Sequence, residues 1–209
     1  MSRRSSSGSD SSINSYTSVL SDDSYLKTLQ PGIDDQFQEM LSHVKKIENH
    51  RRVLKERKIQ SHEVKKRDPN DVGRRLDWTK QMDADYASYK AKVDVLSAAK
   101  SVQEASSRAA RQSRKADLST QEKVRNKALE DDKKWLNAAI AASTERLGFM
   151  TKYPNALDTP TTRSHIKAAE DNLNSAKLAV REIEPQKKKI ADARAIATRQ
   201  AAGSSRHTK

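Results

Sequence analysis

The stretch that decides the fold class runs from Met82 to Leu96 and reads MDADYASYKAKVDVL. Its apolar side chains recur at alternating steps of four and three residues, which is the a/d spacing of a coiled coil: Met82, Tyr86, Tyr89, Val93 and Leu96. This spacing predicts a long helix with one apolar face. We expect that face to continue in smaller residues: Ala99, Val102, Ala105 and Ala109.

Helical periodicity extends in both directions from this stretch and predicts four long helices joined by short turns. Prolines mark the turns, because the residue before a proline resists the helical conformation: Pro69, Pro154 and Pro160. A capping box from Ser119 to Glu122 is expected to open the third helix. Pro185 lies inside the fourth helix, and whether it kinks or ends that helix stays open. The predicted helices cover residues 34–67, 71–117, 120–150 and 160–199.

The predicted fold is all-α, an elongated bundle or coiled coil that occupies residues 31–199. Long helices with narrow apolar faces leave surface that one chain does not cover, so we expect a homo-oligomer. The residues predicted to form its seam have the a/d spacing of the second and fourth helices: Met82, Tyr86, Tyr89, Val93, Leu96, Ile166, Leu173, Val180 and Ile183.

Both ends of the chain differ in composition from this region. Residues 1–30 are rich in serine and poor in apolar residues before Val19, so we expect a disordered tail that Pro31-Gly32 closes. Residues 200–209 are expected to form a basic tail. Charged neighbours suggest phosphorylation in the serine-rich tail, and a merely solvated tail is the alternative. The candidate phosphorylation sites are Ser6, Ser7 and Ser21.

The composition argues against an enzyme. Of the 209 residues, 34% are hydrophobic and 33% charged, which leaves little material for a thick globular core around an active site. The chain has no cysteine, no glycine-rich phosphate loop and no closely spaced histidine pair. We therefore expect no catalytic residues, no cofactor and no metal. Absence of an apolar leader predicts a cytoplasmic protein, and a basic cluster at Lys65-Lys66-Arg67 leaves nuclear import open.

Positive charge is the strongest chemical feature of the sequence. The formal net charge is +13, and residues 45–75 hold 12 lysines and arginines against five acidic residues. A second cluster lies between residues 108 and 115, and a third at Lys187-Lys188-Lys189. The candidate polyanion-binding residues come from the first two clusters: Lys45, Lys46, Arg51, Arg52, Lys55, Arg57, Lys58, Lys65, Lys66, Arg67, Arg74, Arg75, Arg108, Arg111 and Lys115.

Such a surface favours a non-sequence-specific nucleic-acid partner, because lysine and arginine release the counterions of a phosphate backbone. The predicted function is therefore a non-enzymatic, oligomeric scaffold that binds RNA or DNA. Three alternatives stay open. The basic surface could bind an anionic membrane or an acidic protein such as a filament. The chain could also be a cytoskeleton-associated rod whose charges only keep it soluble.

A membrane scaffold has one resemblance in its favour. Lys65-Lys66-Arg67-Asp68, Asp85-Tyr86 and Ala91-Lys92-Val93 resemble the basic second helix of BAR domains over about 30 residues. This resemblance implies a dimer of kinked helices with a basic membrane-binding face. The predicted helix lengths depart from that family, since the first helix is short and the capping box interrupts the second. No family residues are carried over to this chain.

Overall fold

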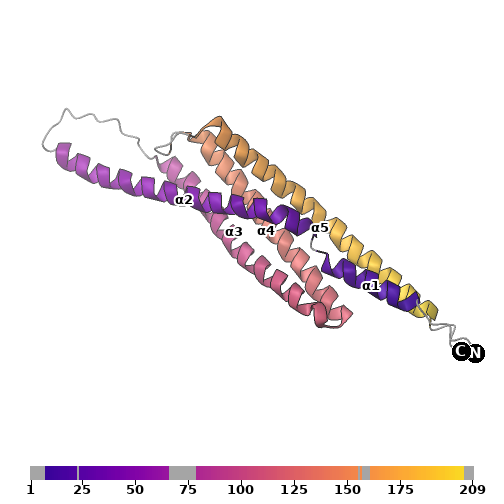
Figure 1. The fold of residues 1–209 in the computed structure, drawn as a ribbon. Coiled ribbons are helices and arrows are strands. Elements are labelled where there is room, and N and C mark those ends of the chain that lie inside the picture. The colour runs from indigo at the N-terminus through magenta and orange to yellow at the C-terminus, as the bar shows by residue number, and fades with distance from the viewer. Residues whose placement is uncertain (1–7, 23, 66–78, 155, 157–160, 205–209) are drawn as a thin grey trace, which may run out of the picture. The chain divides into compact units, whose positions relative to one another are not determined.

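The structure is a computed structural model that describes residues 8–22, 24–65, 79–154, 156 and 161–204. Within these residues every regular element is helical, which confirms the all-α prediction (Figure 1). A short 3-10 helix, η1 (Ser113–Lys115), follows α3. The α-helices are α1 (Gly8–Ser21), α2 (Ser24–Lys65), α3 (Lys80–Gln112), α4 (Leu118–Lys152) and α5 (Arg163–Ser204).

Two compact units make up the chain. Unit 1 comprises the chain up to Gln30, Ala98–Asn137 and the chain from Lys177 onward. Unit 2 comprises Pro31–Ser97 and Ala138–Ala176. Helices α2 to α5 each contribute one segment to either unit, whereas α1 belongs to unit 1 alone.

Helix α1 lies where the sequence analysis expected disorder. Tyr16 and Leu20, four residues apart, are both buried, and the Tyr16 hydroxyl donates to Glu122 of α4 at 2.8 Å. The serine-rich composition gave no sign of this helix. Two large side chains on one face are enough to dock a short segment onto other helices. Pro31 does not close the segment either: it lies inside α2 and coincides with the boundary between the two units.

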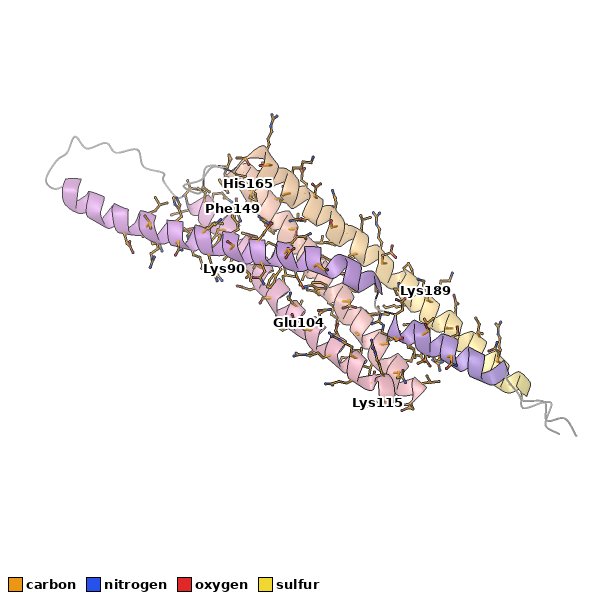
Figure 2. The ribbon with its side chains drawn as sticks, in the orientation of Figure 1. Lys90, Glu104, Lys115, Phe149, His165 and Lys189 are labelled. Carbon is orange, nitrogen blue, oxygen red and sulfur yellow. The ribbon has the colours of Figure 1, made fainter. Side chains whose placement is uncertain are left out.

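Unit 2 has an aromatic core built around Phe149 of α4, which Figure 2 labels. Its ring centroid lies 6.3 Å from those of Tyr86 and Tyr89 on α3 and 5.2 Å from that of Tyr153. Aliphatic side chains of α2 and α5 complete the core: Ile33, Met40, Val44, Ile47 and Leu173. The face predicted from Met82 to Leu96 is thus buried in unit 2.

Unit 1 has a smaller core with polar side chains in it. Trp135 and Leu129 of α4 and Ile183 of α5 are all fully buried in it. From α3, buried Gln103 donates to buried Asp132 at 2.9 Å. A buried polar group without a hydrogen-bond partner lowers stability, and this hydrogen bond gives both buried side chains a partner.

The predicted continuation of the α3 face into unit 1 is wrong. Strict alternation of four and three after Leu96 leads to Lys100 and then Gln103, and Gln103 is indeed buried. The predicted series instead continued at Ala99, one position before Lys100. It chose the nearest aliphatic residue and so left the four-and-three spacing of the buried face. Its valine, Val102, is 51% exposed.

Helix α4 is capped by Asp117 and begins at Leu118, not at the predicted capping box. The Asp117 carboxylate accepts hydrogen bonds from the Thr120 backbone N–H at 2.9 Å and from the Thr120 hydroxyl at 2.6 Å. These bonds lower the pKa of Asp117. Glu122, the expected partner of Ser119, accepts instead from Tyr16 and Arg194. An aspartate at the N-cap satisfies the same exposed donor that the box would have used.

Replacing Asp117 by Ala should therefore lower the melting temperature, whereas Ser119→Ala should leave it close to that of the unmodified protein. Asp117→Asn should retain most of the stability, because asparagine caps helices as well. Thermal unfolding followed by circular dichroism measures all three. Equal losses in Asp117→Ala and Ser119→Ala would show that the cap is misassigned.

Candidate polyanion-binding surfaces

Two of the predicted basic clusters keep exposed cations after the helices have packed. The first lies on α2 in unit 2, where four side chains are exposed and form no ion pair with any residue that the structure describes: Lys45, Lys46, Arg52 and Lys55. Lys45 and Arg52 are seven residues apart and share one helix face. Glu48 and Glu56 are interspersed with them, so this α2 group carries a modest positive excess.

The second group, which we call the basic end, follows the C-terminal turn of α3 into η1 in unit 1. It consists of Arg108, Arg111, Arg114 and Lys115, all exposed, and none forms an ion pair within the described part of the chain. Figure 2 labels Lys115 at the turn between α3 and α4. Arg111 Nε donates to the Ser107 carbonyl at 3.3 Å, and cations at a helix C-terminus also favour the helix dipole.

Arg51 is a predicted binding residue that the structure assigns to packing. Its guanidinium donates to Asp83 of α3 at 2.5 Å and lies 5.1 Å from the centroid of the Tyr86 ring. Both contacts tie α2 to α3 within unit 2. The sequence holds one signal that separates Arg51 from Arg52. Arg51 follows Val44 and Ile47 in the four-and-three series of buried positions of α2, whereas Arg52 lies one position outside that series.

The remaining predicted binding residues lie at the end of α2 and beyond it. The side chains of Arg57, Lys58 and Lys65 fall outside the described residues, although their backbone belongs to α2. Lys66, Arg67, Arg74 and Arg75 also fall outside the described residues.

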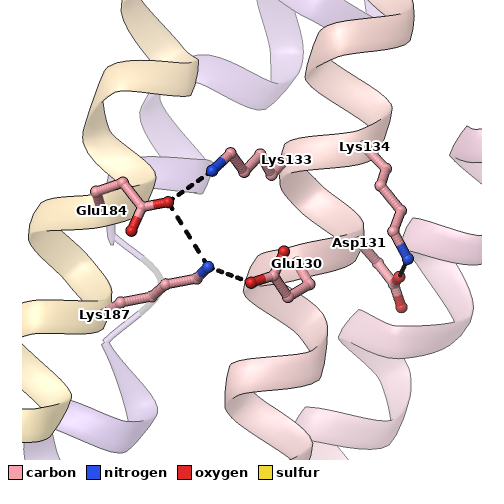
Figure 3. A network of polar contacts seen from close by, with 6 residues as sticks. All are labelled: Glu130, Asp131, Lys133, Lys134, Glu184 and Lys187. Atoms are coloured by element: carbon pink, nitrogen blue, oxygen red, sulfur yellow. Dashed lines mark hydrogen bonds and ion pairs between the residues drawn. The ribbon is translucent and has the colours of Figure 1, made fainter.

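The lysine cluster of α5 is partly neutralised within unit 1. Lys187 forms ion pairs with Glu130 of α4 and, at 3.7 Å, with Glu184, while Lys133 contacts Glu184 at 2.7 Å (Figure 3). Hydrogen bonds to these lysines lower the pKa of Glu130 and of Glu184, and the bond to Glu184 raises the pKa of Lys133. Lys188 and Lys189 stay exposed.

Most of the predicted oligomer seam is buried inside one chain. Met82, Tyr86, Tyr89, Val93, Leu96, Leu173 and Ile183 are all buried, and Ile166 and Val180 are half-buried. These side chains hold the helices of a single chain together. Self-association stays a prediction, and it needs another surface.

The candidate phosphorylation sites divide in the same way between described and undescribed residues. Ser6 and Ser7 lie outside the described residues. Ser21 is exposed in the last turn of α1, and its hydroxyl donates to the Ser18 carbonyl at 3.0 Å.

Sequence reasoning missed two further cations and the role of one histidine. Lys123 and Lys127, four residues apart on α4, are exposed and form no ion pair with described residues. Their spacing was readable, but acidic neighbours made the segment look balanced. His43 is largely buried against Tyr89 and Phe149, and burial together with Arg146 lowers its pKa to about 4.

Comparison with known proteins gives no relative for this chain: no family model, no curated protein and no solved structure matches. In the described segments, no set of three or more histidine and acidic side chains is placed to hold a metal ion. None of the helices there combines the length and apolar character that crossing a membrane requires.

Proposed function

We propose that the protein is a self-associating helical scaffold that binds the phosphate backbone of RNA or DNA without reading sequence. The observation that carries this proposal is the basic end, where four exposed cations within eight residues have no acidic partner among the described residues. Several other cations form ion pairs within the chain, such as Lys152 with Asp85 and Arg146 with Glu39. Cations without internal partners are the ones available to replace counterions on a polyanion.

Burial of the aromatic side chains favours backbone binding over base stacking. Single-strand binding proteins present exposed aromatic rings on which bases stack. Within the described residues the largest rings are buried in the cores, as Tyr86, Tyr89, Trp135 and Phe149 show. Binding through phosphate contacts alone is insensitive to sequence and strongly weakened by salt.

The proposal is tested by measuring the affinity for fluorescently labelled random-sequence DNA and RNA duplexes as a function of salt concentration. Replacing Arg111, Arg114 and Lys115 together by glutamine should weaken binding and reduce the slope of log K against log salt by about 2–3. The matched control replaces three exposed cations of α5 that form no ion pair with described residues, Lys167, Lys177 and Arg181.

The control variant has the same net charge as the basic-end variant, so it should bind nearly as well as the unmodified protein. Equal losses in the two variants would mean that only net charge matters, and the assignment of the basic end would fail. Binding to anionic phosphatidylserine vesicles without binding to either duplex would instead favour the membrane scaffold.

A further inference from the structure

Helix α3 carries apolar side chains on two opposite faces. The buried face of Met82, Tyr86, Tyr89, Val93 and Leu96 packs inside unit 2. The opposite side of the same uninterrupted helix repeats at strict steps of four and three, and we call it the outer face of α3. It consists of Ala84, Ser88, Ala91, Val95, Ala98, Val102, Ala105 and Ala109.

Every residue of the outer face is exposed, and none is charged. Its two valines, Val95 and Val102, are 57% and 51% exposed. A solvated helix face normally carries charged residues, and exposed Glu104 of α3 is one example (Figure 2). Seven aliphatic residues at eight successive a/d positions instead have the pattern of a helix that packs against another helix.

The sizes and charges along this face select its occupant. Both valines occupy a positions, and alanines occupy the d positions. In an antiparallel pair, a positions face d positions, so each valine would meet an alanine; a parallel pair would set valine against valine and leave alanines facing each other. Large side chains opposite small ones fill space better. The pattern therefore complements itself when one copy runs antiparallel to another.

Charges beside the face complement each other in the same arrangement. Asp94 and Arg108 both occupy g positions, and in antiparallel pairs g positions of the two helices lie near each other. With Ala98 of one copy opposite Val102 of the other, Asp94 of each copy falls beside Arg108 of the other. Asp94 is exposed and pairs at 3.3 Å with half-buried Lys90 of its own helix. Such a surface ion pair contributes little to stability, so exchanging it for one with Arg108 costs little.

We propose that the outer face of α3 is a homodimer interface in which two copies pack antiparallel about a two-fold axis near Ser101. The proposal rests on the self-association included in the proposed function and not on polyanion binding. In the dimer Arg108 pairs with Asp94, and the other three cations of the basic end stay open to a polyanion. The residues predicted to form the seam are occupied within the chain, so this face takes over the role that the sequence analysis gave to them. Small side chains allow close approach but bury little area, so the dimer forms reversibly with concentration.

Sedimentation velocity over a wide range of protein concentrations tests the interface without any nucleic acid. The unmodified protein should shift from monomer to dimer as concentration rises. Val95→Glu with Val102→Glu should abolish the shift, because two carboxylates would be placed against alanines. The matched control, Leu178→Glu with Ile196→Glu, changes two equally exposed aliphatic residues of α5, 58% and 53% exposed, and should leave the dimer intact.

A monomer at every concentration would overturn the proposal, as would equal loss of the dimer in both double variants. Neither result bears on polyanion binding, since that is measured at low protein concentration on variants of other residues. Circular dichroism spectra of the variants show that they fold, which is expected because all four side chains lie on the surface.

Single cysteines test the orientation, because the chain contains none of its own. Ser101→Cys lies at the proposed two-fold axis and should crosslink to itself with a short bismaleimide. Ala109→Cys should not crosslink alone but should crosslink when mixed with Ala91→Cys, which it faces in the antiparallel register. Efficient crosslinking of Ala109→Cys to itself would show a parallel pair and overturn the proposed arrangement.

Discussion

Replacing Trp135 by Ala is expected to lower the free energy of unfolding by about 3–5 kcal/mol. Trp135 is fully buried in unit 1 and is the largest side chain there. Its removal forfeits the transfer of a large apolar surface out of water and leaves a cavity that rigid helices close only in part. Because a domain is stable by about 5–15 kcal/mol in total, this single change threatens the fold of the unit.

Urea unfolding followed by circular dichroism measures this loss, since Trp78 would complicate a fluorescence signal. Leu178→Ala is the control: it also removes a large apolar group from unit 1, but from a position that is 58% exposed. Its effect should stay within about 0.5 kcal/mol. A loss below about 1 kcal/mol in Trp135→Ala would show that unit 1 is not packed around this residue.

Helix periodicity predicted the parts of the fold in which one apolar face decides packing. The expected helices at 120–150 and 160–199 correspond to α4 and α5 within a few residues, because prolines and polar turns bound them. The apolar face of residues 82–96 was predicted correctly as buried, because its aromatic and aliphatic side chains all fall on one side of a helix. Large side chains therefore carried most of the information that the sequence held.

Prediction failed where small or polar residues decided the outcome. After Leu96, Gln103 fills a core position. Its hydrogen-bond partner Asp132 lies on another helix, so no local sequence pattern indicates that Gln103 is buried. Helix α1 depends on Tyr16 finding Glu122 more than a hundred residues away. Arg51 was assigned to a basic surface from its charge, although it occupies a position of the apolar series of α2 and its contact with Asp83 makes it part of the packing. A single sequence does not show which distant residue will be the partner of a polar side chain.

Acid should destabilise the protein through His43 well before carboxylates are fully protonated. His43 Nδ1 lies 3.4 Å from the Tyr89 hydroxyl, and its ring lies edge-on to Phe149. Burial, then the positive charges of Arg146, Lys46 and His165, lower its pKa from 6.5 to about 4. Between these two values the unfolded chain binds a proton at His43 that the folded chain does not, so stability falls as the pH falls from 6.5 to 4.

The size of this effect follows from the same two pKa values: a fall from 6.5 to about 4 corresponds to about 3 kcal/mol lost between neutral pH and pH 4. Replacing His43 by Gln removes the titrating group but keeps a polar side chain beside the Tyr89 hydroxyl. The unfolding free energy of the unmodified protein should therefore fall by about 3 kcal/mol more than that of His43→Gln over this range. Urea unfolding at several pH values measures both.

Exposed His165 provides the matched control, because it is the α5 histidine whose charge acts on His43. His165→Gln should keep nearly the full acid sensitivity, since burial contributes more to the shift than any single neighbouring charge. Parallel pH profiles for the unmodified protein and His43→Gln would contradict the burial of this ring, as would an NMR titration that places the His43 pKa near 6.5. If instead His165→Gln removed most of the effect, repulsion between the two histidines and not desolvation would set the acid sensitivity of unit 2.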